Sequence, residues 1–495
     1  MSATAAEDGV WIGLDLGTQS VRALAVSGTG QVVGAGTGKL TSHRDGPRHE
    51  QDPEQWWKEV VAASRRALAG VPAEAVRGVA VDATSGTVLL MDTSGRPLTP
   101  ALMYDDTRAA GEVDRVNAAG APVWAELGYQ RMQPAWALPK LLWLLREFAS
   151  EVGGARLAHQ NDFINRRLIG YDVPSDLSNA LKTGAQLIDE AWPSQVFDVL
   201  GVPGHILPDL VRPGTRLGAV SADAAAETGI PEGTVVVSGM TDGCAAQLGA
   251  GALRVGDWNS VLGTTLIVKG VTDHLIRDPL GAVYSHRSPD GGWLPGGASS
   301  TGAGVISRDF GGRDLDDLNA RAMAYEPASV LAYPLVSEGE RFPFVAADAR
   351  GFVLGSPASE ADLFAATLQG VAYIERLCFD YLESLGAPVN GDLVLTGGAT
   401  KSRYWCQLRA DVLVRPVKLP DNAEPALGMA VLAASQGGRT ADVAAEMVAI
   451  REVIEPRAQA AGRFDAPYLR LIDVLEQRGW LAPSSATHAR ERPQR

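Results

Sequence analysis

Apolar residues occupy strand-like positions in two short runs near the start of the chain, residues 10–15 and residues 21–26. Gly17 and Thr18 separate the two runs, so the pattern predicts a β-hairpin. Asp15 stands at the end of the first strand. A glycine in the turn lets backbone N–H groups approach an anion, and the threonine supplies a hydroxyl group. This combination suits the binding of a phosphate together with its magnesium ion.

The same strand, Gly-Thr turn and strand pattern returns at residues 258–270, with Gly263, Thr264 and Thr265 in the turn. The chain therefore looks internally duplicated, with one phosphate hairpin in each half. At 495 residues it is also longer than a single hydrophobic core usually organises. We expect an N-terminal domain at residues 9–250 and a C-terminal domain at residues 251–482, and two such hairpins facing one cleft could clamp one nucleotide.

The segment after the first hairpin continues as a further strand at residues 31–37, which makes the opening a β-meander. A glycine-rich turn followed by a strand cannot place a helix N-terminus on a pyrophosphate, so neither the dinucleotide-binding fold nor the P-loop fits. Asp52 then predicts the start of a helix that carries Trp56 and Trp57 and ends near Gly70. We interpret the two tryptophans as packing residues.

Two polar breaks follow strand-like runs in the first half. The first holds Asp82, Thr84 and Ser85, and short hydroxyl and carboxylate groups at a strand end suit hydrogen bonding to a polyol. An ordinary polar turn explains it equally well. The second break holds Asp105 and Asp106, where either a sugar hydroxyl or the acidic first turn of a surface helix accounts for the carboxylates.

Asp242 follows three valines that predict a buried strand, and it stands where a small-residue helix should begin. Helix-end amides favour an ionised carboxylate, which could accept a proton from a substrate hydroxyl during phosphoryl transfer. The alternative is a helix N-cap aspartate. The neighbouring hairpins strengthen the catalytic interpretation.

The second half contains a glycine-rich stretch at residues 296–306, which suits either close approach to a ligand or tight helix packing. A long amphipathic helix is predicted to start at Ser359 and to stop at Gly386. Residues 393–405 then predict a strand, a Gly397-Gly398 turn and a helix, leaving room for a flat base against the glycine backbone. The tail at residues 483–495 looks disordered and basic.

Composition narrows the possible functions. The chain is 46% hydrophobic and 21% charged, and no apolar stretch reaches the roughly 18 residues needed to span a membrane. The start lacks the features of a secretory signal, which predicts a cytoplasmic protein. A formal charge of −14 disfavours nucleic acid and anionic membranes as partners. Cys244, Cys378 and Cys406 are too far apart for a metal motif and are expected to be reduced and packed.

Six segments together resemble the FGGY family of carbohydrate kinases, in order and with similar spacing. They are DLGTQSVR at 15–22, EQDPEQWW at 50–57, GMTDG at 239–243, LGTT at 262–265, TGGATKSRYW at 396–405 and EPALGMA at 424–430. The resemblance implies an α/β fold with two ribonuclease-H-like domains of the actin and Hsp70 superfamily. It also implies that a sugar and magnesium-ATP bind in an interdomain cleft.

The resemblance also assigns roles to single residues. Asp242 matches the catalytic base, and Asp15 matches the carboxylate near the magnesium and the reacting hydroxyl. The expected sugar-binding residues are Asp15, Thr84, Ser85, Asp105 and Asp242. The expected nucleotide-binding residues are Gly17, Thr18, Gln19, Thr264, Thr265, Gly302, Gly397, Gly398, Ala399 and Asn422.

The sugar is expected to be a ketopentose. Xylulokinases usually carry Gln-Met-His-Gly where this chain has Asp82 to Gly86, so the histidine often placed near xylulose is absent. The segment VDATSG resembles the pentulose kinases that act on ribulose, which favours phosphorylation of D-ribulose at O5, with D-xylulose as the alternative. A nucleotide-dependent switch or sugar sensor is a further alternative from another functional class. The expected partners are the sugar and ATP alone, in a monomer or a homodimer.

Overall fold

The computed structural model describes residues 9–150, 152–436 and 438–491, and the chain divides into two compact units. Unit 1 comprises residues up to Leu253 together with residues 286–294 and 422–449. Unit 2 comprises residues 254–285, 295–421 and the chain from Ile450 onward. The sequence placed residues 286–294 and 422–449 in the second domain, whereas the structure packs both segments into unit 1.

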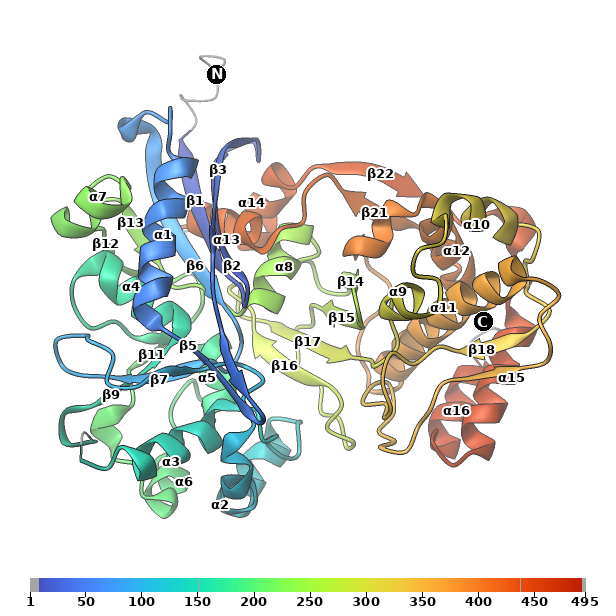
Figure 1. Ribbon diagram of the computed structural model, residues 1–495, viewed down its shortest axis with the longest axis horizontal. Coiled ribbons are helices and arrows are strands. Elements are labelled where there is room, and N and C mark those ends of the chain that lie inside the picture. The colour runs from blue at the N-terminus through green and yellow to red at the C-terminus, as the bar shows by residue number, and fades with distance from the viewer. Residues whose placement is uncertain (1–8, 151, 437, 492–495) are drawn as a thin grey trace. The chain divides into compact units, whose positions relative to one another are not determined.

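A six-stranded sheet forms the centre of unit 1 (Figure 1). Its strand order is β12 (Arg216–Ala219), β13 (Val235–Val237), β6 (Val76–Ala83), β1 (Val10–Leu16), β2 (Ser20–Ser27) and β3 (Val32–Lys39). The strands β1, β2 and β3 run antiparallel in sequence order, which confirms the predicted β-meander. Helix α1 (Pro53–Ala67) covers one face, where its buried Trp56 and Trp57 pack as expected. The opposite face receives α13 (Pro425–Ala434), which also packs against α8 (Asp242–Ala250).

Close backbone packing explains the small residues on this second face. A Cβ atom on Gly13 would lie 1.7 Å from the carbonyl oxygen of Ala426, and one on Gly428 would lie 2.0 Å from that of Ala245. Only glycine permits these approaches of β1 to α13 and of α13 to α8. The helix α13 is thereby fixed on the sheet of unit 1, although it follows β1 in the sequence by more than 400 residues.

A smaller sheet completes unit 1, with strand order β4 (His43–Asp45), β5 (Arg48–Gln51), β8 (Ala101–Leu102), β7 (Val88–Met91) and β9 (Arg156–His159). A two-stranded sheet pairs β10 (Ser175–Asp176) with β11 (Leu210–Val211). The remaining α-helices of unit 1 are α2 (Val113–Glu126), α3 (Ala137–Glu147), α4 (Gln160–Ile169), α5 (Leu177–Ala180), α6 (Ser194–Leu200), α7 (Ala222–Thr228) and α14 (Thr440–Met447).

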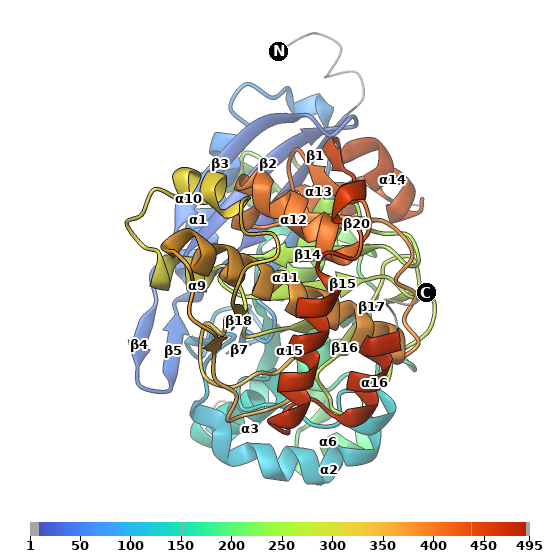
Figure 2. The same cartoon turned by 90° about the vertical axis from the view of Figure 1, so that its right-hand side faces the viewer.

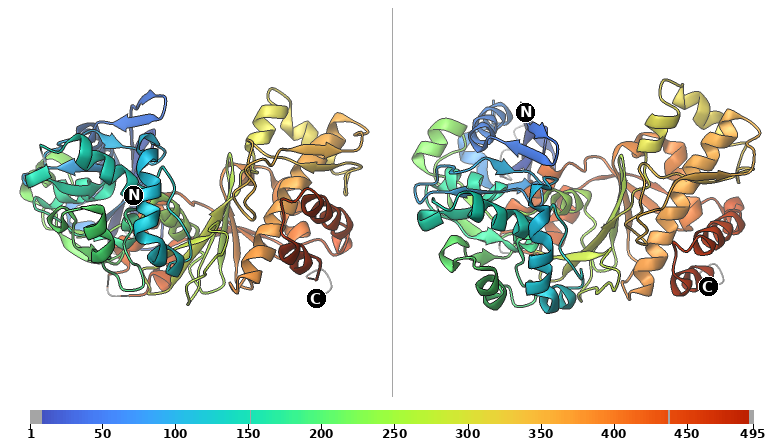
Figure 3. Two further views of the ribbon diagram at one scale, coloured as in Figure 1. Left: turned by 90° about the horizontal axis from the view of Figure 1, so that it is seen from below. Right: turned by 60° about the horizontal axis from the view of Figure 1, so that its bottom comes forward.

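The second large sheet has seven strands, most of them in unit 2. Its order is β16 (Tyr284–Arg287), β17 (Trp293–Ala298), β15 (Leu266–Gly270), β14 (Trp258–Leu262), β20 (Leu393–Thr396), β21 (Val417–Pro420) and β22 (Ile450–Ile454). The long helix α11 (Glu360–Ser384) belongs to the same apolar core as this sheet, and Figure 3 shows it in orange beside the strands. Its N-cap is Ser359, as predicted, because the Ser359 side chain accepts a hydrogen bond from the backbone N–H of Asp362.

The other elements of unit 2 are α9 (Gly304–Asp309), α10 (Leu315–Ala322), α12 (Arg403–Leu413), α15 (Asp465–Gln477), α16 (Pro483–Glu491) and the paired strands β18 (Leu331–Tyr333) and β19 (Phe352–Leu354). The prediction of a disordered tail is wrong for residues 483–491, which form α16 beside α15 (Figure 2). Buried Ala486 and Ala489 attach this helix to the core, a contact too small to register as an apolar pattern. Residues 492–495 lie outside the described residues.

The two large sheets repeat one topology, which confirms the predicted duplication. In unit 1 the hairpin β1–β2 lies beside parallel β6, followed by parallel β13 and antiparallel β12. In unit 2 the hairpin β14–β15 lies beside parallel β20, followed by parallel β21 and antiparallel β22. This is the α/β architecture expected from the sequence. All three cysteines are free and buried, and no helix in the described segments has the length and apolar character needed to cross a membrane.

Candidate active site

Two aspartates meet where β1 and β6 end in unit 1. Asp15 and Asp82 occupy directly paired positions of these parallel strands, and their carboxyl groups are close enough to influence each other's pKa. Burial raises the pKa of Asp15 to about 6, and the negative charges of Asp242 and Glu424 act in the same direction, whereas Arg22 opposes them. Asp82 is completely buried, and burial together with the charge of Asp15 raises its pKa as well. The pair therefore binds a proton more readily than isolated carboxylates do.

Asp242 lies at the first position of α8, close enough for its charge to raise the pKa of both other aspartates. The N-cap position belongs to Thr241, whose backbone pairs with Ala83 at the end of β6. One carboxylate oxygen of Asp242 accepts a hydrogen bond from the backbone N–H of Gly243 at 2.7 Å. The alternative of an N-cap aspartate is therefore wrong by one residue, and the fold brings Asp15, Asp82 and Asp242 together.

The turn between β1 and β2 is held by hydrogen bonds from outside the hairpin. The amide of Gln51 donates to the carbonyl oxygen of Thr18 at 2.6 Å, and the backbone N–H of Leu40 donates to that of Gln19 at 2.9 Å. Within the turn, the N–H of Gly17 donates to the carbonyl oxygen of Ser20 at 3.1 Å. These bonds fix the shape of the turn and leave the side chain of Gln19 exposed.

Two neighbouring hydroxyl groups after β6 have different surroundings. Thr84 Oγ1 donates to the Gln160 side chain at 2.8 Å and lies 2.6 Å from the hydroxyl of Thr87, so its hydrogen-bonding capacity is used inside the protein. Ser85 Oγ is buried and has no partner in the part of the chain that the structure describes. A buried hydroxyl without a partner is uncommon and needs an explanation. Of the two, Ser85 is better placed to accept a ligand.

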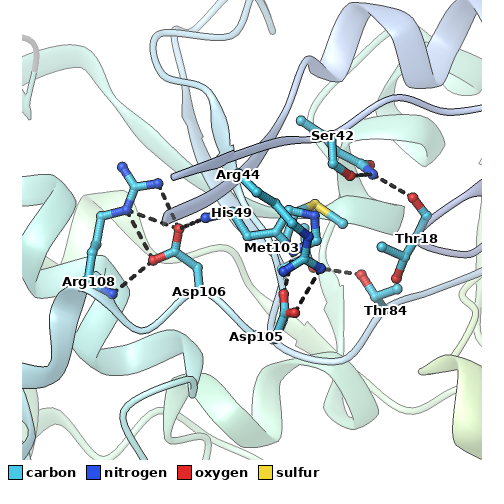
Figure 4. Close-up of polar contacts among 12 residues, drawn as sticks. Thr18, Ser42, Arg44, His49, Thr84, Met103, Asp105, Asp106 and Arg108 are labelled. Atoms are coloured by element: carbon cyan, nitrogen blue, oxygen red, sulfur yellow. Dashed lines mark hydrogen bonds and ion pairs between the residues drawn. The ribbon is translucent and has the colours of Figure 1, made fainter. Parts of the chain in front are cut away.

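The segment after β8 carries a network of ion pairs (Figure 4). Arg44 donates to Asp105 at 2.9 Å, and the ring of His49 makes a short contact with the same carboxylate. Burial acts to raise the pKa of Asp105, but the hydrogen bonds from His49 and Arg44 outweigh it and hold that pKa below its usual value. Asp106 is fully buried, binds the guanidinium of Arg108 and accepts from the backbone N–H of His49 at 2.8 Å. Asp106 is therefore structural, and Asp105 stays charged at the surface of unit 1.

Sequence reasoning assigned no site role to two residues here. Tyr104 is 40% exposed, and it lies close enough to the Thr18 side chain of the first hairpin for Thr18 to act on its pKa. Asp82 was recognised only as part of a polar break. Its pairing with Asp15 could have been found from the sequence, because both residues end runs that predict adjacent parallel strands.

A cavity of about 420 Å³ in unit 2 lies at the turn of the second hairpin. It is lined by Thr264 on that turn, by Ala303 and Gly304 at the start of α9, by Asn319 on α10 and by Gly398, Ala399 and Trp405 near α12, among others. Its apolar walls and few polar groups are typical of a small-molecule site. Thr264, Gly398 and Ala399, which the sequence assigned to the nucleotide, are thus brought together.

The other residues expected at the nucleotide do not line this cavity. Gly302 and Gly397 pack against backbone instead: a Cβ atom would come within 2.3 Å of the Thr264 carbonyl oxygen and 2.6 Å of that of Leu262, respectively. Both are glycines because of this packing. Thr265 is half-buried in the turn. Asn422 belongs to unit 1, where its side-chain oxygen accepts from the backbone N–H of Glu424 at 2.9 Å.

Comparison with known proteins gives one consistent result. The N-terminal domain model of the FGGY family of carbohydrate kinases matches residues 10–249, and the C-terminal domain model matches residues 254–437. The chain is 30% identical over 439 residues to a xylulose kinase of Streptomyces rubiginosus, covering 87% of this chain and 89% of that protein. It is 28% identical over 441 residues to a xylulose kinase of Escherichia coli, covering 86% and 89%.

A solved structure agrees with these matches. The crystal structure of xylulose kinase from Rhodospirillum rubrum superposes with a TM-score of 0.83 at 26% identity, covering 94% of this chain and 98% of that one. Together with the duplicated sheets, the clustered aspartates of unit 1 and the cavity of unit 2, these matches establish that the chain belongs to the FGGY family of carbohydrate kinases and is an ATP-dependent sugar kinase.

Proposed function

We propose that this kinase phosphorylates a ketopentose, D-ribulose, at O5. The observation that carries the proposal is the turn after β6, where Ser85 presents a buried hydroxyl that has no partner among the described residues. D-Ribulose and D-xylulose differ only in configuration at C3, so discrimination depends on which group meets that hydroxyl. The turn offers a short hydroxyl where xylulokinases usually carry a histidine.

Asp242 is the proposed general base. It would accept the proton of the O5 hydroxyl while O5 forms its bond to the γ-phosphorus of ATP and the bond from that phosphorus to the β,γ-bridging oxygen breaks, leaving ADP. Its place at the start of a helix favours the ionised form that this role requires. Tyr104 and Asp105, on the segment after β8, are the proposed sugar contacts beside the first hairpin.

We propose that a magnesium ion binds at the carboxylates of unit 1. Asp15 offers a carboxylate at the strand end, and neither oxygen of fully buried Asp82 has a hydrogen-bond partner among the described residues. Hard oxygen ligands of this kind are the ones that Mg²⁺ prefers. We propose Asp15 as the protein ligand, and the ion would supply charge neutralisation for the phosphates.

The nucleotide is proposed to bind in the 420 Å³ cavity of unit 2, with Thr264 near its phosphates and Gly398 and Ala399 against the adenosine. D-Xylulose is the second candidate substrate. It is favoured by the names of the relatives, since the curated relatives described above are xylulose kinases.

A substrate panel tests the proposal. ADP release by the purified protein with magnesium-ATP would be measured with D-ribulose, L-ribulose, D-xylulose, ribitol and glycerol. We expect kcat/KM for D-ribulose to exceed the others by about tenfold or more, equivalent to roughly 1.4 kcal/mol of transition-state binding. A preference for D-xylulose would replace the substrate and keep the mechanism. Equal ADP release without any sugar would point to a nucleotide-dependent switch.

The role of Ser85 has its own test. Replacing Ser85 with Ala removes one hydroxyl and should raise KM for the preferred ketopentose by about tenfold, because one hydrogen bond to the sugar is lost. The matched control is Thr84→Val, which removes a hydroxyl that the protein itself uses, and should lower stability more than sugar affinity. Steady-state kinetics and thermal melting of both variants decide between them. An unchanged sugar KM in Ser85→Ala would contradict the assignment.

A further inference from the structure

One buried lysine in unit 1 binds two segments of the proposed sugar site at once. Lys140 lies on α3 with 0% of its surface exposed. Its ammonium group donates to the carbonyl oxygen of Gly86 at 2.8 Å and to that of Met103 at 2.6 Å. Gly86 closes the turn that carries Ser85, and Met103 directly precedes Tyr104 and Asp105. The two backbone segments are therefore joined through a single amino group.

A second lysine holds the first of these segments from another element. Lys182, on the short helix at Leu181–Thr183, donates to the carbonyl oxygen of Ser85 at 3.1 Å. Gly86 has φ = +93°, and a Cβ atom there would lie 3.1 Å from the Lys182 side chain. Two consecutive carbonyl groups of the turn thus each accept a hydrogen bond from a different lysine.

Burying the ammonium group of Lys140 costs more free energy than packing alone would justify. No carboxylate makes a hydrogen bond or ion pair with Lys140 in the described residues, and burying an ammonium without one is unfavourable. Burial lowers the pKa of Lys140 to about 7, with Lys182 and Arg108 acting in the same direction and Asp106 and Asp105 acting against them. A leucine or methionine would fill the space in α3 at less cost. The lysine instead satisfies two carbonyl groups that belong to separate loops.

We propose that Lys140 is a positioning residue that fixes the turn at residues 84–87 relative to the segment at residues 103–106, so that both can bind one sugar, with Lys182 securing the first of them. This inference rests on the proposed role of Ser85, Tyr104 and Asp105 in sugar binding. Lys140 acts through the backbone carbonyls of Gly86 and Met103. It should therefore set the affinity for the sugar and leave nucleotide affinity unaffected.

The test uses Lys140→Met, which keeps the length of the side chain and removes its donors. We expect KM for the best sugar of the wild-type protein to rise by about tenfold or more, while KM for ATP changes by less than about threefold. Hydrogen–deuterium exchange should increase in both segments, 84–87 and 103–106. Lys182→Met should increase exchange in 84–87 only, with a smaller rise in sugar KM.

Asn117→Leu is the matched control. Asn117 on α2 also ties down a loop, since it donates to the carbonyl oxygen of Met132 at 3.1 Å and accepts from its N–H at 2.7 Å. It should lower the melting temperature and leave sugar KM unchanged. If Lys140→Met changed both KM values in proportion to its loss of stability, as a general weakening would, the inference would be overturned.

The Lys182→Met variant and the exchange measurement test the inference even if Lys140→Met does not fold or no sugar is phosphorylated. If Lys140→Met did not fold, the exchange and KM effects of Lys182→Met would carry the test, and their absence would count against the inference. If the wild-type protein phosphorylated none of the sugars, the proposed function would fail by itself. Exchange in the two segments would then still show whether Lys140 holds them.

Discussion

Three aspartates meet at the end of the sheet in unit 1, and their charges work against one another. Asp15 and Asp82 are neighbours on paired strands, and Asp242 adds a third negative charge from α8. Such clustering lowers the stability of the folded protein when all three groups are ionised. It is typical of a site where electrostatic strain serves chemistry, because strongly perturbed carboxylates concentrate at functional sites.

The raised pKa of Asp15 predicts a specific dependence of stability on pH. Its pKa of about 6 in the folded protein exceeds the ordinary aspartate value of 3.8, so the folded state favours the protonated form. The stability that this proton provides is fully present below about pH 4 and is lost as the pH rises through 6. Asp15→Asn should therefore stabilise the protein at pH 8 by up to about 3 kcal/mol and should have little effect at pH 4. Thermal or urea unfolding at both pH values measures this, and equal effects at both would contradict it.

Asp242→Asn tests the catalytic base. The amide keeps the shape of the side chain and cannot accept the hydroxyl proton, so kcat should fall by a factor of about 100 or more. ATP affinity, measured by calorimetry or fluorescence, should stay within about threefold, since the nucleotide is proposed to bind in unit 2. Retention of more than about a tenth of wild-type kcat would remove Asp242 from this role.

For single residues, the sequence predicted that hydroxyl groups follow β6, but it did not predict which of the two neighbouring hydroxyl groups is left free to bind a ligand. Thr84 and Ser85 are equivalent in the sequence, yet Gln160 and Thr87 form hydrogen bonds with the hydroxyl of Thr84, whereas that of Ser85 has no partner in the described part of the chain. Gln160 is 76 residues away in the sequence from Thr84. No local pattern contains that information.

At the scale of single elements, the turn after β20 contains two adjacent glycines with different reasons for being glycine. Gly397 has φ = +88°, and a Cβ atom would lie 2.6 Å from the Leu262 carbonyl oxygen, so a side chain is excluded by the backbone. A Cβ atom on Gly398 would meet nothing within 4 Å, and this residue lines the cavity of unit 2. Gly397 is therefore required for backbone packing, and Gly398 leaves the cavity open for a ligand.

Valine substitutions separate these two roles. Gly398→Val should fold with a melting temperature close to that of the wild type and raise KM for ATP by about tenfold or more, because the side chain enters the cavity. Gly397→Val should lower stability by about 2 kcal/mol or more. Thermal melting and ATP kinetics of both variants check this. A normal ATP KM in Gly398→Val would show that the nucleotide binds elsewhere.

The hairpins, the helix after Asp52 and the helix after Ser359 were predictable because their patterns are local. Asp52 caps α1 through the backbone N–H of Glu54, but Gln55, three residues after Asp52, does not complete a capping box. The side chain of Gln55 accepts instead from the backbone N–H and the hydroxyl of Thr41, at 3.1 Å and 2.9 Å. A contact between distant segments outcompeted the local one.

At the scale of the whole molecule, unit 1 is assembled from three pieces of chain. The last piece carries α13, whose Ala426, Leu427, Ala430 and Val431 pack against Leu24 and Val26 of β2. The sequence could not show this, because the small apolar residues of α13 fit a helix of either domain. The close approach of the α13 backbone to β1 and α8 is what places this helix in unit 1.

This assembly predicts the behaviour of fragments. Residues 1–253 alone lack the helix that covers one face of the sheet, so they should not show a cooperative thermal transition. The same fragment joined by a flexible linker to residues 422–449 should regain it. Circular dichroism during heating measures both. A cooperative transition in the short fragment would mean that α13 is dispensable for folding of unit 1.

The two repeated hairpins differ in the residue that stands two positions before the glycine of the turn. Counting back from each Gly-Thr turn, Asp15 of the first hairpin corresponds to Val261 of the second. Asp15 is paired with Arg22 and Asp82, whereas Val261 is paired with Ile267 and Thr396. The two hairpins share one backbone topology but differ in chemistry. The first has a carboxylate near the end of its leading strand, and the second has an apolar side chain there. Symmetry of architecture in this enzyme is therefore no guide to symmetry of function.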